Sequence, residues 1–158
     1  MLKAVSALIL CLGLAGCRDA MTITWQAPET GVSLVMTLRP LLSLQSDWER
    51  TLTLSTPRGS ISLDLLTDTG WWQGSNLYAG APGVWMLDEG QADCIVIEVD
   101  PAKLEWTSCT AKAAAAGAAS RKFQDYRYLG YFSERDRDAG PRFMDATERA
   151  EQPLPDGM

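Results

Sequence analysis

The feature that most constrains the fold of this 158-residue chain is a period-two alternation of apolar residues. The alternation runs through three segments, 32–39, 51–55 and 61–65. Its apolar residues are Val32, Leu34, Met36, Leu38, Leu52, Leu54, Ile61, Leu63 and Leu65. Because successive side chains of a β-strand point to opposite faces, the pattern predicts strands with one buried face.

The second and third of these segments are joined by turn-forming residues at 56–59. A hairpin about this turn places Leu54 opposite Ile61 and Leu52 opposite Leu63. Further strands are expected at 22–26, 76–79, 84–87, 94–99, 104–109, 125–132 and 142–144. Many short strands at this spacing predict an all-β domain, either an antiparallel sandwich or a small barrel, of about 8–10 strands.

The amino terminus has the composition of a secretory signal peptide. Lys3 precedes an apolar run over 4–14, which ends in Leu14-Ala15-Gly16-Cys17. These four residues resemble the lipobox of bacterial lipoproteins, which implies cleavage after residue 16 and a lipid on Cys17. The apolar run is shorter than the roughly 20 residues of a membrane-spanning helix. With Arg18 directly after the cysteine, the resemblance favours the periplasmic face of the outer membrane.

These features divide the chain into four parts. Residues 1–16 are the expected signal peptide, 17–20 a lipid-anchored linker and 21–146 a single β domain. From 147 to 158, glutamates, prolines and a glycine predict a disordered tail. Within the domain, the alanine-rich segment 111–119 predicts either a short helix or a low-complexity connection.

Two cysteines remain once Cys11 leaves with the signal peptide and Cys17 carries the lipid. We expect Cys94 and Cys109 to form a disulfide in an oxidising compartment. Their spacing is not that of a redox-active Cys-x-x-Cys pair, so we interpret the bond as structural. A four-residue loop over 100–103 places the two cysteines directly opposite each other.

The same register sorts the faces of this hairpin. The side expected to face the core carries Ile95, Ile97, Val99, Leu104 and Trp106. On the other side, Glu98 is expected directly opposite Glu105, which predicts either a cation or raised-pKa site or an ordinary solvated face.

Charge and composition limit the chemistry of the chain. The net charge of −6 disfavours a nucleic-acid partner and is compatible with a basic protein partner. Because the chain has no histidine, histidine-based catalytic groups are excluded and most zinc sites are ruled out. The segment from Glu134 to Gly140 is loosely similar to a calcium loop but misses the EF-hand spacing. We therefore predict no metal and no cofactor.

Aromatic residues supply the candidate binding surface. Of six tryptophans, Trp25, Trp85 and Trp106 are expected in the core. Trp71 and Trp72 lie in a polar, glycine-flanked stretch ahead of Tyr78, and these three residues are the candidate partner contacts. The alternative is that one of the two adjacent rings is buried while the other covers a sheet edge.

Three functions remain open at this point. The first is a lipid-anchored, non-enzymatic protein-binding module, such as an inhibitor, immunity protein or chaperone. The second is a structural or assembly component of an envelope complex. The third is a carboxylate-based cell-wall hydrolase in which Trp71 or Trp72 stacks on a sugar.

Overall fold

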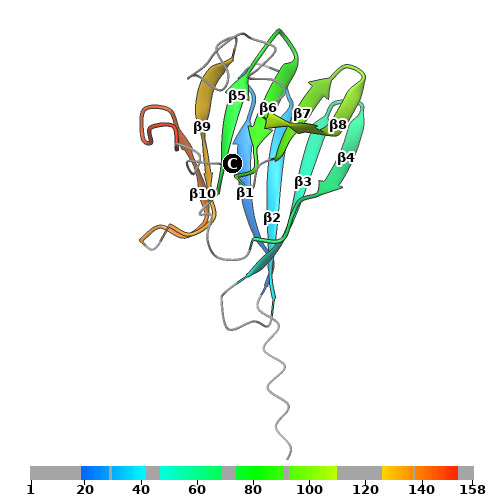
Figure 1. Ribbon diagram of the computed structural model, residues 1–158. Coiled ribbons are helices and arrows are strands. Elements are labelled where there is room, and N and C mark those ends of the chain that lie inside the picture. The colour runs from blue at the N-terminus through cyan, green and yellow to red at the C-terminus, as the bar shows by residue number, and fades with distance from the viewer. Residues whose placement is uncertain are drawn as a thin grey trace, which may run out of the picture.

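The computed structural model describes residues 19–28, 30–41, 47–68, 74–90, 93–109, 126–136 and 138–152. Ten β-strands make up the regular structure of these residues, and they form two antiparallel sheets (Figure 1). The predicted all-β class is therefore confirmed, and its form is an open two-sheet sandwich. The signal peptide, Cys17 and the alanine-rich segment lie outside the described residues.

The first sheet contains four strands in sequence order. They are β1 (Met21–Gln26), β2 (Ser33–Pro40), β3 (Trp48–Thr56) and β4 (Gly59–Asp64). In the β3–β4 hairpin Leu54 lies opposite Ile61 and Leu52 opposite Leu63, which confirms the predicted register. The two-residue turn between these strands thus places the apolar residues on one face, as the alternation requires.

The second sheet contains six strands in the order β10-β9-β5-β6-β7-β8. They are β5 (Gly74–Ala79), β6 (Val84–Asp88), β7 (Asp93–Val99), β8 (Ala102–Ser108), β9 (Arg127–Ser133) and β10 (Arg142–Asp145). The β5–β9 pairing shifts register between Leu77 and Tyr78. Gly130 lies opposite Leu77 with φ of +152°, and a Cβ there would lie 2.3 Å from the Met144 carbonyl oxygen. This irregularity therefore requires glycine.

The two sheets pack face to face around one core. Strand β1 lies against β10, and β4 lies against β8. The core contains buried residues from both sheets, with Trp25 in edge contact with Trp85 at 5.1 Å between ring centroids. Trp85 and Trp106 are partly buried against this core. The expected core positions of these three tryptophans are thus confirmed.

The β7–β8 hairpin differs from the expected one by two residues. Its turn is Asp100-Pro101, and Val99 lies opposite Ala102. Proline takes the third position of the four-residue turn through a cis bond, whereas we expected it at the second position. The four-residue loop over 100–103 and the register derived from it are therefore wrong.

A shift by two residues keeps every side chain on its predicted face, because the side-chain period of a strand is also two. Ile95 and Ile97 accordingly face the core. Across the hairpin, however, Glu98 lies opposite Lys103, and Glu105 lies opposite Val96. The expected pairing of Glu98 with Glu105 does not occur, and Glu105 forms an ion pair with Lys103 at 2.5 Å.

The segment after β10 is ordered through Gln152. Asp145 accepts hydrogen bonds from the Thr147 and Glu148 amides, and Gln152 exchanges hydrogen bonds with Asn76. The first six residues of the expected disordered tail, 147–152, therefore lie against the domain, while 153–158 are outside the described residues. Among the residues described, no helix has the length and apolar character needed to cross a membrane.

Candidate functional site

The predicted disulfide between Cys94 and Cys109 is present, with 5.1 Å between the two Cα atoms. Cys94 lies opposite Thr107, so the bond runs diagonally to a residue just beyond the end of β8. Both cysteines are buried beside Met86 and Tyr78, on the side of the second sheet that faces away from the main core.

Of the three candidate partner contacts, the structure describes only Tyr78. Trp71 and Trp72 lie outside the described residues. Tyr78 is only 2% exposed, and its hydroxyl donates a hydrogen bond to the Glu151 carboxylate at 2.8 Å. Its ring is therefore covered by the chain itself, which differs from the exposed contact that we expected.

The segment that carries Trp71 and Trp72 starts and ends at firmly held positions. On one side Asp68 bridges to the backbone of Trp48 and accepts two hydrogen bonds from Arg135, at 2.7 and 3.0 Å. On the other side Gly74 packs so closely that a Cβ would lie 1.9 Å from the Phe132 carbonyl oxygen. The two residues that flank segment 69–73 are thus fixed to the sandwich.

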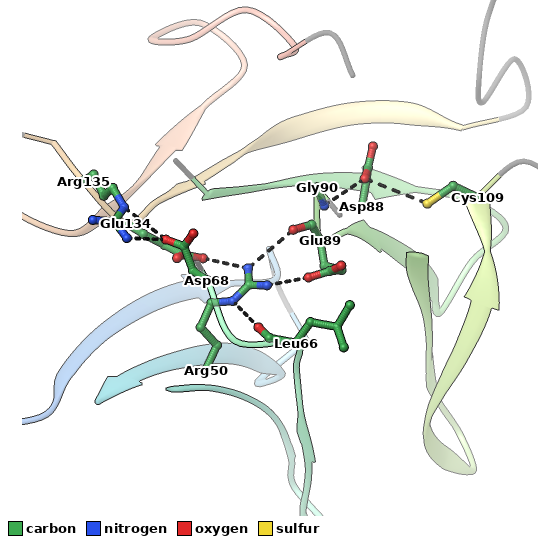
Figure 2. Close-up of polar contacts among 9 residues, drawn as sticks. All are labelled: Arg50, Leu66, Asp68, Asp88, Glu89, Gly90, Cys109, Glu134 and Arg135. Carbon is green, nitrogen blue, oxygen red and sulfur yellow. Dashed lines mark hydrogen bonds and ion pairs between the residues drawn. The ribbon is translucent and has the colours of Figure 1, made fainter. Parts of the chain in front are cut away.

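Beside these ends lies a buried ionic cluster centred on Arg50, which is 2% exposed (Figure 2). The Arg50 guanidinium forms ion pairs with Glu89 and Glu134, the latter at 3.2 Å. It also donates to the carbonyl oxygens of Leu66, at 2.8 Å, and of Glu89, at 3.4 Å. Since Arg50 belongs to the first sheet while Glu89 and Glu134 follow strands of the second, the cluster joins the two sheets.

Local strand geometry explains why these charges point inward. Arg50 has the same parity along β3 as the buried Leu52 and Leu54. Glu134, just beyond the end of β9, likewise has the same parity as the buried Phe132. The sequence analysis missed this cluster, although a charged residue in phase with an apolar alternation is a signal that could have revealed Arg50.

The electrostatics of the cluster raise the pKa of Glu134. The pKa of Glu134 is raised to about 7, because burial raises it most strongly, the positive charge of Arg50 lowers it, and the negative charge of Asp68 raises it. Its second carboxylate oxygen, Oε2, is buried and has no hydrogen-bond partner among the described residues. Figure 2 shows Arg50 and Arg135 facing the carboxylates of Asp68, Glu89 and Glu134.

This arrangement suits a structural role better than acid–base catalysis. A general acid must reach the substrate proton within hydrogen-bond distance. Glu89 and Glu134 are 0% and 1% exposed, so neither carboxylate is accessible from the surface. The cluster instead stabilises the end of the sandwich from which segment 69–73 starts.

A second group of potential ligand atoms lies at Asp88, Cys94 and Cys109, all within 4.8 Å of one another. Metal binding by cysteine requires a thiolate, and both sulfur atoms are here joined in the disulfide. The 3.9 Å contact between Cys109 Sγ and Asp88 Oδ1 is likewise a packing contact, since a disulfide sulfur has no proton to donate. These residues therefore do not form a metal site while the bond is intact.

The chain matches no protein-family model, and no curated protein or solved structure shows significant similarity to it.

Proposed function

We propose that this protein is a lipid-anchored periplasmic lipoprotein whose β-sandwich binds a basic protein partner without catalysing a reaction. The lipobox-like Leu14-Ala15-Gly16-Cys17 supports the anchor. A lipoprotein with two or more acyl chains is attached stably to its membrane. The net charge of −6 supports a basic partner, because opposite charges steer association.

The observation that carries the proposal is the Cys94–Cys109 disulfide within a compact sandwich. Disulfides persist in oxidising compartments such as the bacterial periplasm and are rare in the cytosol. The bond and the lipobox-like motif lie far apart in the sequence and support the same compartment independently.

The partner surface proposed for this function includes segment 69–73 with Trp71 and Trp72. Its two ends are held by the Asp68–Arg135 ion pair and by the close packing of Gly74. A rigid scaffold that presents a short aromatic segment lowers the entropy cost of binding. This combination supports a binding module whose contacts come from segment 69–73.

The experiment that tests this function is chemical crosslinking of the lipidated protein in its native envelope, followed by affinity capture and mass spectrometry. We expect one stoichiometric partner of net positive charge, with a recovery that falls at least tenfold for Trp71→Ala combined with Trp72→Ala. Trp48→Phe is the matched control, since Trp48 packs against the core. Recovery of no stoichiometric partner, or equal recovery with the double variant, contradicts the proposal.

A second candidate function is a component of a membrane-proximal envelope complex. Only residues 18–20 separate Cys17 from β1, so the linker reaches about 14 Å at most. The domain would therefore stay close to the bilayer. Co-purification with an integral membrane complex, in place of a soluble basic protein, would favour this second function.

A further inference from the structure

The outward side of β5 and β9 carries a polar aromatic surface, which we call the tyrosine face. It consists of Asn76, Tyr78, Tyr128 and Tyr131. Asn76 lies opposite Tyr131 and Tyr78 opposite Tyr128, and the rings of the last pair are 5.8 Å apart. Leu77, Leu129 and Phe132 pack in the main core, so their neighbours on the tyrosine face point away from it, and Tyr78 and Tyr128 pack in the second cluster.

The chain covers the tyrosine face with its own residues 149–152, which we call the C-terminal strap. The Glu151 carboxylate accepts the Tyr78 hydroxyl hydrogen bond at 2.8 Å. Gln152 exchanges two backbone hydrogen bonds with the Asn76 side chain, at 2.9 and 3.2 Å. The strap thus lies on the face as a bound peptide would, through a carboxylate, a backbone amide and a backbone carbonyl.

Arg149 occupies a cation position on this face. Its guanidinium carbon lies 4.4 Å from the centroid of the Tyr131 ring, a cation–π contact. Burial raises the pKa of the Tyr131 hydroxyl, Arg149 lowers it, and the carboxylates of Glu134 and Asp68 raise it further. The Arg149 guanidinium thus lies over the face of a buried aromatic ring.

The C-terminal strap is joined to the domain outside the strand pairing of the two sheets. None of its residues belongs to a β-strand in the described part of the chain. The turn before it, which starts at Asp145, makes its own hydrogen bonds from Thr147 and Glu148 to Asp145. Release of 150–152, with the Arg149 side chain rotated away from Tyr131, would leave β10 and this turn in place, because the Arg149 amide can still donate to the Asp145 carbonyl oxygen.

We propose that the tyrosine face is a docking site for a basic, extended segment of the partner, and that the C-terminal strap occupies this site until a partner cation replaces Arg149. This inference rests on the proposed function, because it assumes a basic protein partner. The partner segment would supply a cation over Tyr131, a carboxylate to Tyr78 and a backbone amide and carbonyl to Asn76. The tethered strap competes at a high effective concentration, so only a tight or similarly tethered partner displaces it.

The test uses the full-length chain and a fluorescent synthetic peptide of residues 145–158 as the probe. In a variant that combines Arg149→Ala with Glu151→Ala, the strap loses its cation and its carboxylate. We expect this variant to bind the peptide at least tenfold more tightly than the unaltered protein does, as measured by fluorescence anisotropy. A peptide that carries Arg149→Ala should bind at least tenfold more weakly than the unaltered peptide.

Two further substitutions keep the test specific to the tyrosine face. We call the protein with Arg149→Ala and Glu151→Ala the loosened protein. In it, Tyr131→Phe keeps the ring and should retain peptide binding, while Tyr131→Leu removes the ring and should abolish binding. An intact Cys94–Cys109 bond and an unchanged near-ultraviolet circular dichroism spectrum establish that each variant is folded.

Two results would overturn the inference. One is equal peptide affinity for the unaltered and loosened proteins, and the other is peptide affinity that does not depend on Arg149. Either result leaves the proposed function standing if envelope crosslinking still captures a basic partner. Loss of that partner with retained peptide binding would instead remove the proposed function.

Discussion

Arg50 and Arg149 show how differently one residue type is used in two regions of this protein. Arg50 lies between the two sheets, where it forms ion pairs with Glu89 and Glu134 and donates to two carbonyl oxygens. Arg149 lies on the outer surface, where it contacts the Tyr131 ring and donates to Gln152 three residues away. The first arginine connects strands distant in sequence, whereas the second fastens a short terminal segment.

The difference lies in what each arginine leaves behind when it is removed. A buried charge that loses its partner pays its full desolvation cost. A surface contact that opens exposes its groups to water, which replaces most of the lost interaction. The Arg50 cluster should therefore stay closed in the folded state, while the C-terminal strap can open locally.

The largest expected effect is that of Arg50→Ala. The substitution leaves Glu89 and Glu134 buried without their cation, so the free energy of unfolding at pH 7 should fall by roughly 3–5 kcal/mol. Urea unfolding measures this loss. Arg58→Ala is the matched control, because its ion pair with Asp100 is exposed and should not measurably affect stability. A loss for Arg50→Ala as small as that of the control would contradict the assigned role of the cluster.

The next largest effect is expected from the disulfide, which stabilises the side of the second sheet near the tyrosine face independently of the Arg50 cluster. Replacing Cys94 and Cys109 together by alanine should lower the free energy of unfolding by about 3 kcal/mol, as expected for a loop of 15 residues. A reductant should destabilise the unaltered protein similarly and leave the double variant unchanged. If the reductant has no effect on the unaltered protein, the bond does not form in solution.

The Arg50 cluster also predicts a pH dependence of stability. The folded-state pKa of Glu134 is about 7, above the ordinary value of 4.5, so folding favours its protonated form. This contribution to stability is complete below pH 4.5 and is lost as the pH rises through 7. It amounts to on the order of 3 kcal/mol.

The Glu134→Gln variant tests the direction of this pH dependence, because glutamine stays neutral throughout the pH range. The variant should lose less stability than the unaltered protein when urea unfolding at pH 5 and pH 8 is compared. An identical loss in both proteins would show that Glu134 does not titrate between these values.

The smallest expected effects are at the tyrosine face. Tyr78→Phe removes the hydroxyl that donates to Glu151 and should lower the free energy of unfolding by about 1 kcal/mol or less, since the strap can open without unfolding the domain. Tyr131→Phe removes a buried hydroxyl that has no hydrogen-bond partner among the described residues, so stability should stay equal or rise slightly. Thermal denaturation of the two variants measures both effects. A loss for Tyr78→Phe as large as that for Arg50→Ala would eliminate the contrast between the regions.

The alternation of Leu52 and Leu54 with polar residues was sufficient to predict β3, its partner β4 and their register. In the β7–β8 hairpin the same pattern predicted the buried face correctly and the register wrongly. A slip by two residues leaves the apolar residues on one side, so the pattern cannot distinguish the two registers. The two registers differ in their turn, which in the structure is Asp100-Pro101.

The two arginine regions were beyond the sequence analysis for different reasons. Glu89, Glu134 and Asp68 lie beyond the ends of strands, where charged residues usually face solvent. Their burial depends on loops that meet only in the folded sandwich. Residues 149–152 have the composition of a disordered tail, and their order depends on contacts with Asn76 and Tyr78, distant in sequence.

Native-state hydrogen exchange tests the contrast between the two regions most directly. The Leu65 amide donates to the Arg50 carbonyl oxygen within the joined end of the sandwich, and the Gln152 amide donates to the Asn76 side chain under the strap. We predict that Leu65 exchanges only through global unfolding, while Gln152 exchanges at least a hundredfold faster through local opening. Equal protection of the two amides would contradict the claim that the sandwich is closed and the C-terminal strap displaceable.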